Sequence, residues 1–134
     1  MNETDRRNKN KVLITYLRSL IKDYKIKAEY STDDKDIKVI VVQEASGNKQ
    51  IFFDNNNALY NYFNIEIFGD NIQEEYEVAN KINDLIGQTI YLEYESQYWQ
   101  IIFNQYTNPR AIEYYDIRRV SYTSTYQCVV NRIR

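Results

Sequence analysis

The sequence NIEIFGD at residues 64–70 closes a strand and opens a helix, and the rest of the fold can be worked out from it. Before Gly69, apolar and polar residues alternate, and a period of two predicts a strand over residues 59–68. After Gly69, apolar residues return at helical spacing and predict a helix over residues 71–86. A strand that leads directly into a helix indicates a mixed fold.

Both ends of this helix carry signals in the sequence. Asp70 and Gln73 have the spacing of a capping box, and Glu74 and Glu75 suit the positive end of the helix dipole. Gly87 stands where a C-terminal glycine cap belongs. We therefore expect this helix to be the best-bounded element of the chain.

Upstream, residues 1–10 form a polar leader, and apolar residues at helical spacing predict a first helix over residues 12–24. A β-branched run at residues 37–43 predicts a strand. A turn then precedes the short apolar segment 51–53, so we expect a hairpin between these two strands.

Downstream, the pattern is β throughout. Alternation predicts strands over residues 89–94 and 99–104, and the turn at residues 107–109 is expected to end their pairing. The last strand, about residues 119–131, would span roughly 40 Å, so we expect it to bend, bulge or reach beyond its own sheet. The expected fold class is α+β, a mostly antiparallel sheet with two helices packed on one side, in a single domain over residues 11–134.

Composition excludes several classes of function. A chain of 134 residues fits one domain, and no apolar run is long enough to cross a bilayer. With 17 Lys and Arg against 19 Asp and Glu, the basic surface of a sequence-specific nucleic-acid binder is missing. The sequence has no His, one Cys and three Gly, which argues against catalytic triads, metal sites and phosphate-binding loops. We expect no enzyme activity, no cofactor and no metal.

The remaining candidates for chemistry have simpler structural explanations. Glu93 and Glu95 share a strand face, and Glu113 with Asp116 lies near arginines, so solvated faces and ion pairs account for both pairs better than acid–base catalysis does. Cys128 is expected to be a buried apolar residue. A carboxylate-based enzyme is the last alternative.

Tyrosines are the unusual feature, with 14 in the chain. This frequency is equally typical of an AT-rich genome, but tyrosine beside arginine is also the composition of protein interfaces. The residues that we expect to serve self-association or docking are Tyr60, Tyr62, Tyr114, Tyr115, Asp116, Arg118 and Arg119.

The order of elements, together with NIEIFGD at 64–70, EYEVANKI at 75–82, residues 99–109 and 116–132, resembles the tail-terminator and minor-capsid proteins of long-tailed bacteriophages. These are also described as tail-completion or head–tail joining proteins. The resemblance covers most of the chain from about Val12 and lies in element order and short phrases.

The resemblance implies a structural virion protein of the tail or neck, assembled in the host cytoplasm as a ring that is typically a hexamer. Such a ring ends the tail tube, so its partners would be further copies, the tail tube protein and the head–tail connector protein, with no membrane. Two alternatives stay open: a head-side connector or stopper protein, and a free-standing α+β protein-binding module.

Overall fold

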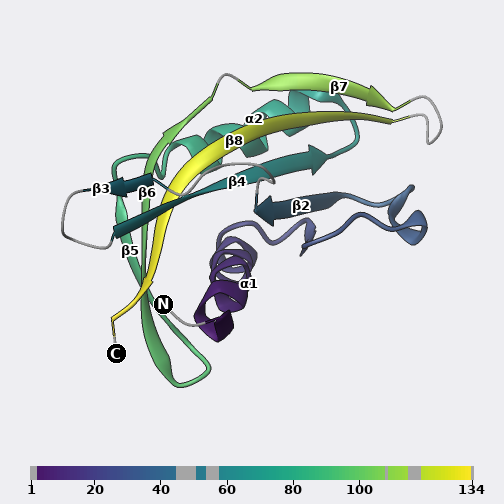
Figure 1. Cartoon of the computed structure of the whole chain (residues 1–134). Helices are drawn as coiled ribbons and strands as arrows, with labels where there is room; N and C mark the ends of the chain where they lie inside the picture. Colours follow the sequence, from purple (N-terminus) through teal and green to yellow (C-terminus); the bar gives the residue numbers. More distant parts are fainter. Residues whose placement is uncertain (1–2, 45–50, 54–57, 108, 115–118, 134) are drawn as a thin grey trace.

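The computed structural model describes residues 3–44, 51–53, 58–107, 109–114 and 119–133. Two α-helices, one short 3-10 helix and eight strands lie in these residues (Figure 1). In chain order they are α1 (Glu3–Leu20), β1 (Lys25–Lys27), η1 (Thr32–Asp34), β2 (Val39–Glu44), β3 (Ile51–Phe53), β4 (Ala58–Phe68), α2 (Ile72–Asn83), β5 (Thr89–Tyr94), β6 (Gln97–Tyr106), β7 (Arg110–Tyr114) and β8 (Arg119–Arg132).

The strands form one sheet in the order β1-β2-β4-β8-β6-β5, with β3 paired to β4 and β7 paired to β8. The β1–β2 pair is parallel and the other pairs are antiparallel. The expected hairpin between residues 37–43 and 51–53 is wrong, because β2 and β3 each pair with β4 at successive stretches. Long-range pairing with β4 therefore replaces the local pairing that the turn suggested.

The strands β6 and β7 lie one after the other along β8, as the green and yellow ribbons of Figure 1 show. β6 ends at Tyr106, just before the turn predicted at residues 107–109, but pairing with β8 resumes at Arg110 opposite Thr123, which the sequence did not predict. The register shifts between Phe103 and Gln105, and an irregularity of this kind bends a strand. The extra residue lies in β6, and β8 curves along its length beside it (Figure 1).

Both helices pack against the same face of the sheet, which confirms the predicted α+β architecture with its mostly antiparallel sheet. α1 buries Val12, Leu13 and Leu17, and α2 buries Val78 and Ile82 in the same core. We call this side the helix face and the opposite side the open face. The strands contribute Ile40, Val42, Phe63, Ile65, Ile67, Trp99, Ile101, Phe103, Tyr126, Cys128 and Val130 to this core.

α1 differs from its predicted extent. It begins at Glu3, so that residues 3–10 of the expected leader belong to the helix, and it ends at Leu20 rather than near Tyr24. Within this first part, the Asn10 side-chain amide donates to the Val42 carbonyl at 3.2 Å. This contact ties the start of the helix to the sheet.

α2 differs from the prediction at both of its ends. Its N-cap is Asn71, whose side chain accepts from the Glu74 N–H at 2.9 Å, so the expected Asp70–Gln73 box is wrong. Asp70 lies one residue before the cap, and its N–H donates to the Glu74 carboxylate at 2.9 Å. Gly87 does have a positive φ of 84°, but it lies beyond the helix, where its N–H donates to the Phe103 carbonyl at 2.7 Å.

A second, smaller cluster lies on the open face. Val39, Val41 and Phe68 are buried there, and Tyr30 and Tyr114 pack against them. The ring centroids of Tyr30 and Phe68 are 4.7 Å apart. Since Tyr30 precedes η1, this cluster fixes the connection between β1 and β2 over the end of the sheet.

Candidate functional site

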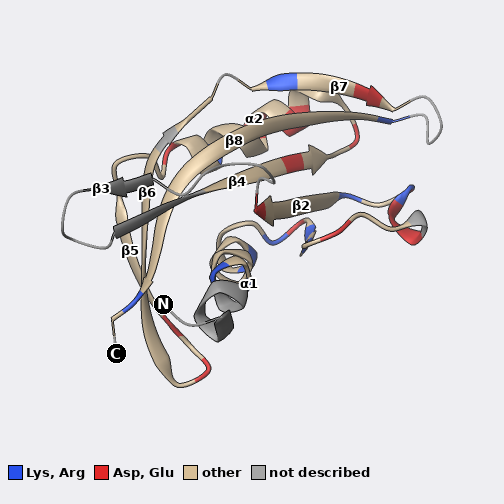
Figure 2. Cartoon of the chain, in the orientation of Figure 1, with Lys and Arg blue, Asp and Glu red and all other residues tan. Residues whose placement is uncertain are grey.

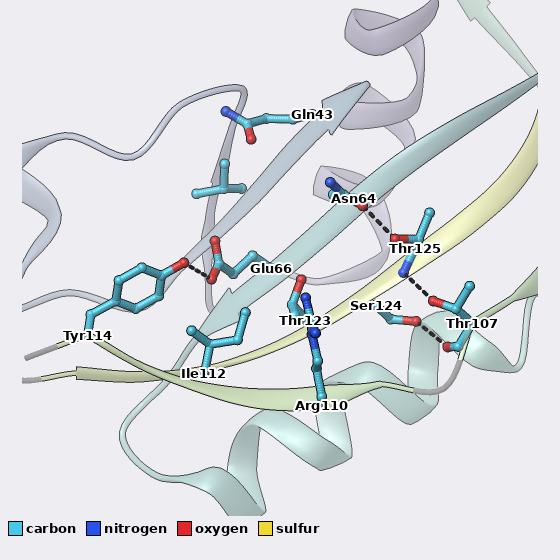
Figure 3. A pocket seen from close by; sticks show the side chains of 11 residues that line it. Gln43, Asn64, Glu66, Thr107, Arg110, Ile112, Tyr114, Thr123, Ser124 and Thr125 are labelled. Carbon is cyan, nitrogen blue, oxygen red and sulfur yellow. Dashed lines mark hydrogen bonds between the residues drawn. The ribbon is translucent and has the colours of Figure 1, made fainter. Parts of the chain in front are cut away.

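A polar hollow of about 440 Å³ lies on the open face, between β7 on one side and β2 on the other (Figure 3). We call it the trough. Its register explains its composition, since Val41, Glu66, Thr123 and Arg110 lie side by side across four strands. The full lining is Val41, Gln43, Asn64, Glu66, Thr107, Arg110, Ile112, Tyr114, Thr123, Ser124 and Thr125.

Glu66 is the central group of the trough. One of its carboxylate oxygens accepts from the Tyr114 hydroxyl and from the Ser121 hydroxyl, both at 2.6 Å. Figure 3 shows the other oxygen directed away from Tyr114. Nearby, Asn64 accepts from the Thr125 hydroxyl at 2.5 Å, which fixes its amide. The trough thus presents oriented hydrogen-bonding groups, which suit a polar protein surface more than a reacting centre.

The second feature is the junction between β4 and α2, where several backbone groups meet charged side chains. The Gly69 N–H donates to Glu75 at 2.7 Å, and Lys38 pairs with Glu74. A Cβ on residue 69 would stand 2.6 Å from the Tyr24 hydroxyl, so only glycine fits without displacing that side chain. Close packing at the junction explains the turn that the sequence signalled.

Glu75 is buried at this junction, with 1% of its surface exposed. Burial raises the pKa of Glu75 to about 7, against the opposing influence of the Gly69 N–H and of Arg119. Its Oε1 is a buried oxygen without a hydrogen-bond partner among the described residues. The sequence suggested that Glu75 merely favours the helix dipole, and its burial was not foreseen.

Asp34 holds the β1–β2 connection in place and is fully buried. Its carboxylate accepts from the Ser31 N–H at 2.8 Å and from the Lys27 ammonium at 2.7 Å. Burial alone would raise the pKa of Asp34, but the bonds from Lys27 and Ser31 outweigh it and hold the pKa below its usual range. These bonds stabilise the buried carboxylate of Asp34, so its burial is explained by its part in the fold.

Arg119, an expected docking residue, is half-buried and has partners within the chain. Its guanidinium donates to the carbonyls of Asp34 at 2.7 Å and Gly69 at 3.4 Å, and lies 5.2 Å from the Phe68 ring centroid. Tyr114 is also turned inward, toward Glu66. The structure therefore brings Arg119 and Tyr114 together at one end of the open face, where both stabilise the fold.

The other expected docking residues are placed only in part. Tyr62 is half-buried on the open face, where it accepts from the Gln127 amide at 3.2 Å. Tyr60 lies in β4 opposite Ile51, with its side chain outside the description. Tyr115, Asp116 and Arg118 lie outside the described residues.

The tyrosines with large exposed areas are mostly others. Tyr91 and Tyr98, on β5 and β6, are 64% and 48% exposed, and Tyr76 on α2 and Tyr106 on β6 are exposed as well. Both contact other tyrosine rings: Tyr76 packs edge-on against Tyr122, and the ring centroids of Tyr106 and Tyr126 are 5.9 Å apart. Sequence reasoning missed them because alternation alone does not show which face a neighbour covers.

Residues for other kinds of chemistry are placed as follows. Cys128 is buried on the helix face, as predicted, and burial raises the pKa of its thiol. Within the described ranges, no three His, Cys, Asp or Glu side chains stand close enough to hold a metal ion. Neither helix described above has the length and apolarity that a bilayer crossing needs.

Comparison with known proteins gives no family for this chain: no family model matches it, and no curated protein matches its sequence.

Proposed function

We propose that this chain is a structural virion protein of a long-tailed bacteriophage, forming a ring that ends the tail tube and joins the tail to the head. The proposal starts from the sequence resemblance, which covers the order of both helices and the later strands. The α+β fold is compatible with it.

The observation that carries the proposal is that large apolar side chains are exposed on separate surfaces. Ile72 and Tyr76 are exposed one turn apart on α2, whereas Tyr91 and Tyr98 are exposed on the open face of β5 and β6. A ring requires heterologous contacts, in which two different surfaces of each copy meet. Exposed aromatic and aliphatic groups on two surfaces supply candidates for such contacts.

The charge distribution also supports this role. Lys and Arg are interspersed with Asp and Glu in Figure 2, and the long β8 ribbon is tan except near its ends. The formal net charge is -2. A near-neutral subunit suits a channel that DNA passes through, since strong phosphate binding needs clustered cations.

The test is assembly with a tube protein. We expect the purified chain, mixed with its cognate tail tube protein, to form rings at one end of each tube in negative-stain micrographs. A chain that leaves tubes bare and unterminated would contradict the proposal.

A matched pair of variants locates the contact. Y76S should reduce ring formation, whereas the control N80S, at an exposed polar position of α2, should not. Cross-linking then separates the two virion roles: a tail terminator contacts tube protein, and a head-side connector or stopper contacts head-side proteins.

A further inference from the structure

The outer edge of β5 is a six-residue strand edge with one partner strand. β5 pairs with β6, and no strand of the described residues lies on its other side. Along it, Thr89, Tyr91 and Glu93 are exposed, while Ile90, Leu92 and Tyr94 are half-buried. An unpaired edge of this length and low charge is a template for adding another strand.

Two backbone bonds show which main-chain groups point outward. The Ile133 N–H donates to the Tyr98 carbonyl, and the Gly87 N–H donates to the Phe103 carbonyl. The side to which the backbone N–H and C=O groups point alternates along a strand. The backbone groups of Trp99 and Ile101 therefore point toward β5, where they meet those of Leu92 and Ile90. The N–H and C=O groups of Thr89, Tyr91 and Glu93 therefore point away from β6.

We propose that β5 pairs antiparallel with β5 of a second copy of this chain, about a two-fold axis at Tyr91. In this register Tyr91 faces the partner's Tyr91, and Thr89 faces the partner's Glu93. All outward-pointing groups then meet each other, as an antiparallel ladder requires.

The side chains fit the same register on both faces of the sheet. On the helix face, Ile90 meets the partner's Leu92, an apolar pair of the kind that stabilises neighbouring strands. On the open face, the two Tyr91 rings come together, and each Glu93 meets a neutral threonine. No like charges are opposed, so the strand is complementary to itself.

The edges of β1 and β7 do not fit β5 in this way. On β1, the Arg18 guanidinium already binds the outward Ile26 carbonyl, at 3.0 and 2.7 Å. On β8, the Thr125 carbonyl accepts from the Thr107 N–H, so the backbone groups of Thr123 and Ser121 also point to the β7 side. Their partners Arg110 and Ile112 therefore bond to β8, and the backbone groups of Ala111 and Glu113 point outward. The side chains of Ala111 and Glu113 lie on the helix face, whereas those of Thr89, Tyr91 and Glu93 lie on the open face. Antiparallel pairing of β7 with β5 would therefore place the helix face of one sheet beside the open face of the other.

This contact goes beyond the proposed function. A two-fold contact closes on itself, whereas the contacts around a ring are heterologous. The β5 pair would therefore join copies two by two, before assembly or between rings, and it can be tested on the chain alone. A single strand pair buries less area than a typical stable interface, so we expect association in the micromolar range.

The experiment uses proline to block the edge without touching the fold. In Y91P the lost N–H points away from β6, so the internal ladder stays intact while the outer edge loses its central donor. Y91T keeps that N–H and is the matched control. Light scattering over a concentration series should show wild type approaching twice the 16.2 kDa of one chain, and Y91T, which lacks the ring but keeps the donor, should associate more tightly than Y91P.

Y91P should raise the dimer dissociation constant by at least about tenfold, with an unchanged circular dichroism spectrum. Wild type that stays monomeric throughout the series, or Y91P that associates as tightly as wild type, would overturn the proposal.

Cysteine cross-linking checks the register independently of folding. Under mild oxidation Y91C should form disulfide-linked dimers, whereas the control E77C, exposed on α2, should not; Cys128 is buried and should not react. Equal cross-linking of both variants would also overturn it. If the chain is monomeric in solution and still forms rings on tubes, the proposed function stands and only this inference is refuted.

Discussion

The two outer edges of the sheet, β1 and β5, are finished in different ways. The β1 edge is three residues long, its outward carbonyl is bound by Arg18, and the connection that follows is anchored by Asp34 and Arg119. The β5 edge is six residues long and carries the most exposed tyrosine among the described large apolar side chains. Side chains that close one edge contribute to folding, whereas an open edge remains available for association.

Removing the anchor of the β1 side should have the strongest consequence for stability. D34A leaves the Lys27 ammonium and the Ser31 donors without their buried acceptor, so we expect a loss of about 3 kcal/mol in the free energy of unfolding. Denaturant unfolding measures it. D33A, an exposed residue of the same 3-10 helix, should change the free energy by less than about 0.5 kcal/mol. Equal effects of the two variants would show that the anchor is not Asp34.

Proton linkage at Glu75 gives the next effect, and its sign is opposite to that at Asp34. Because the pKa of Glu75 is raised from 4.5 to about 7, the folded chain binds the proton more tightly than the unfolded chain. Stability contributed by this group is complete below pH 4.5 and is lost as pH rises through 7, by roughly 3 kcal/mol in total. For Asp34, whose pKa is lowered, stability is present above the ordinary value of 3.8 and is lost as pH falls.

E75Q tests this assignment. The amide cannot ionise and can still accept from the Gly69 N–H, so the fall in stability between pH 5 and 8 should flatten. The control is E77Q, an exposed glutamate of the same helix, which should keep the wild-type slope. A slope in E75Q as steep as that of wild type would assign the linkage to another group.

These two carboxylates also show where sequence reasoning stops. Periodicity predicted the α+β class, both helices and most strands, because residues that alternate or recur locally carry that signal. It did not predict that β6 and β7 follow one strand, since Pro109 and its neighbours have the local signature of a turn. Nor did it show that Glu75 is buried while its neighbour Glu74 pairs with Lys38, because both depend on residues distant in sequence.

The site followed the same rule. Cys128 was predicted correctly, because its burial follows from strand alternation. Arg119 and Tyr114 bond to Asp34 and Glu66, which come from elements far apart in the chain, and their expected part in docking stays a prediction. Their contacts could not be read from the residues beside them.

A smaller effect sharpens the difference at the edges themselves. R18M keeps most of the side-chain stem but loses both donors to the Ile26 carbonyl, so we expect a loss of about 1 kcal/mol, since the arginine is partly solvated. Amide exchange at Lys25, whose N–H bonds to the Lys38 carbonyl, should quicken as β1 frays. K22M, at an exposed position beyond the end of α1, is the control, and exchange at Lys25 as slow as in wild type would mean that Arg18 does not seal this edge.

The smallest effect is expected at Tyr91. In dilute protein Y91S should change the free energy of unfolding by less than about 0.5 kcal/mol, because the ring is largely in solvent. Y94S, three residues along the same strand, removes a ring packed against the core and should cost about 1 to 2 kcal/mol. The two variants remove the same atoms from the same strand, so the difference between them measures how much of β5 serves the fold. If Y91S were as costly as Y94S, Tyr91 would be covered within the chain, and β5 would be closed like β1.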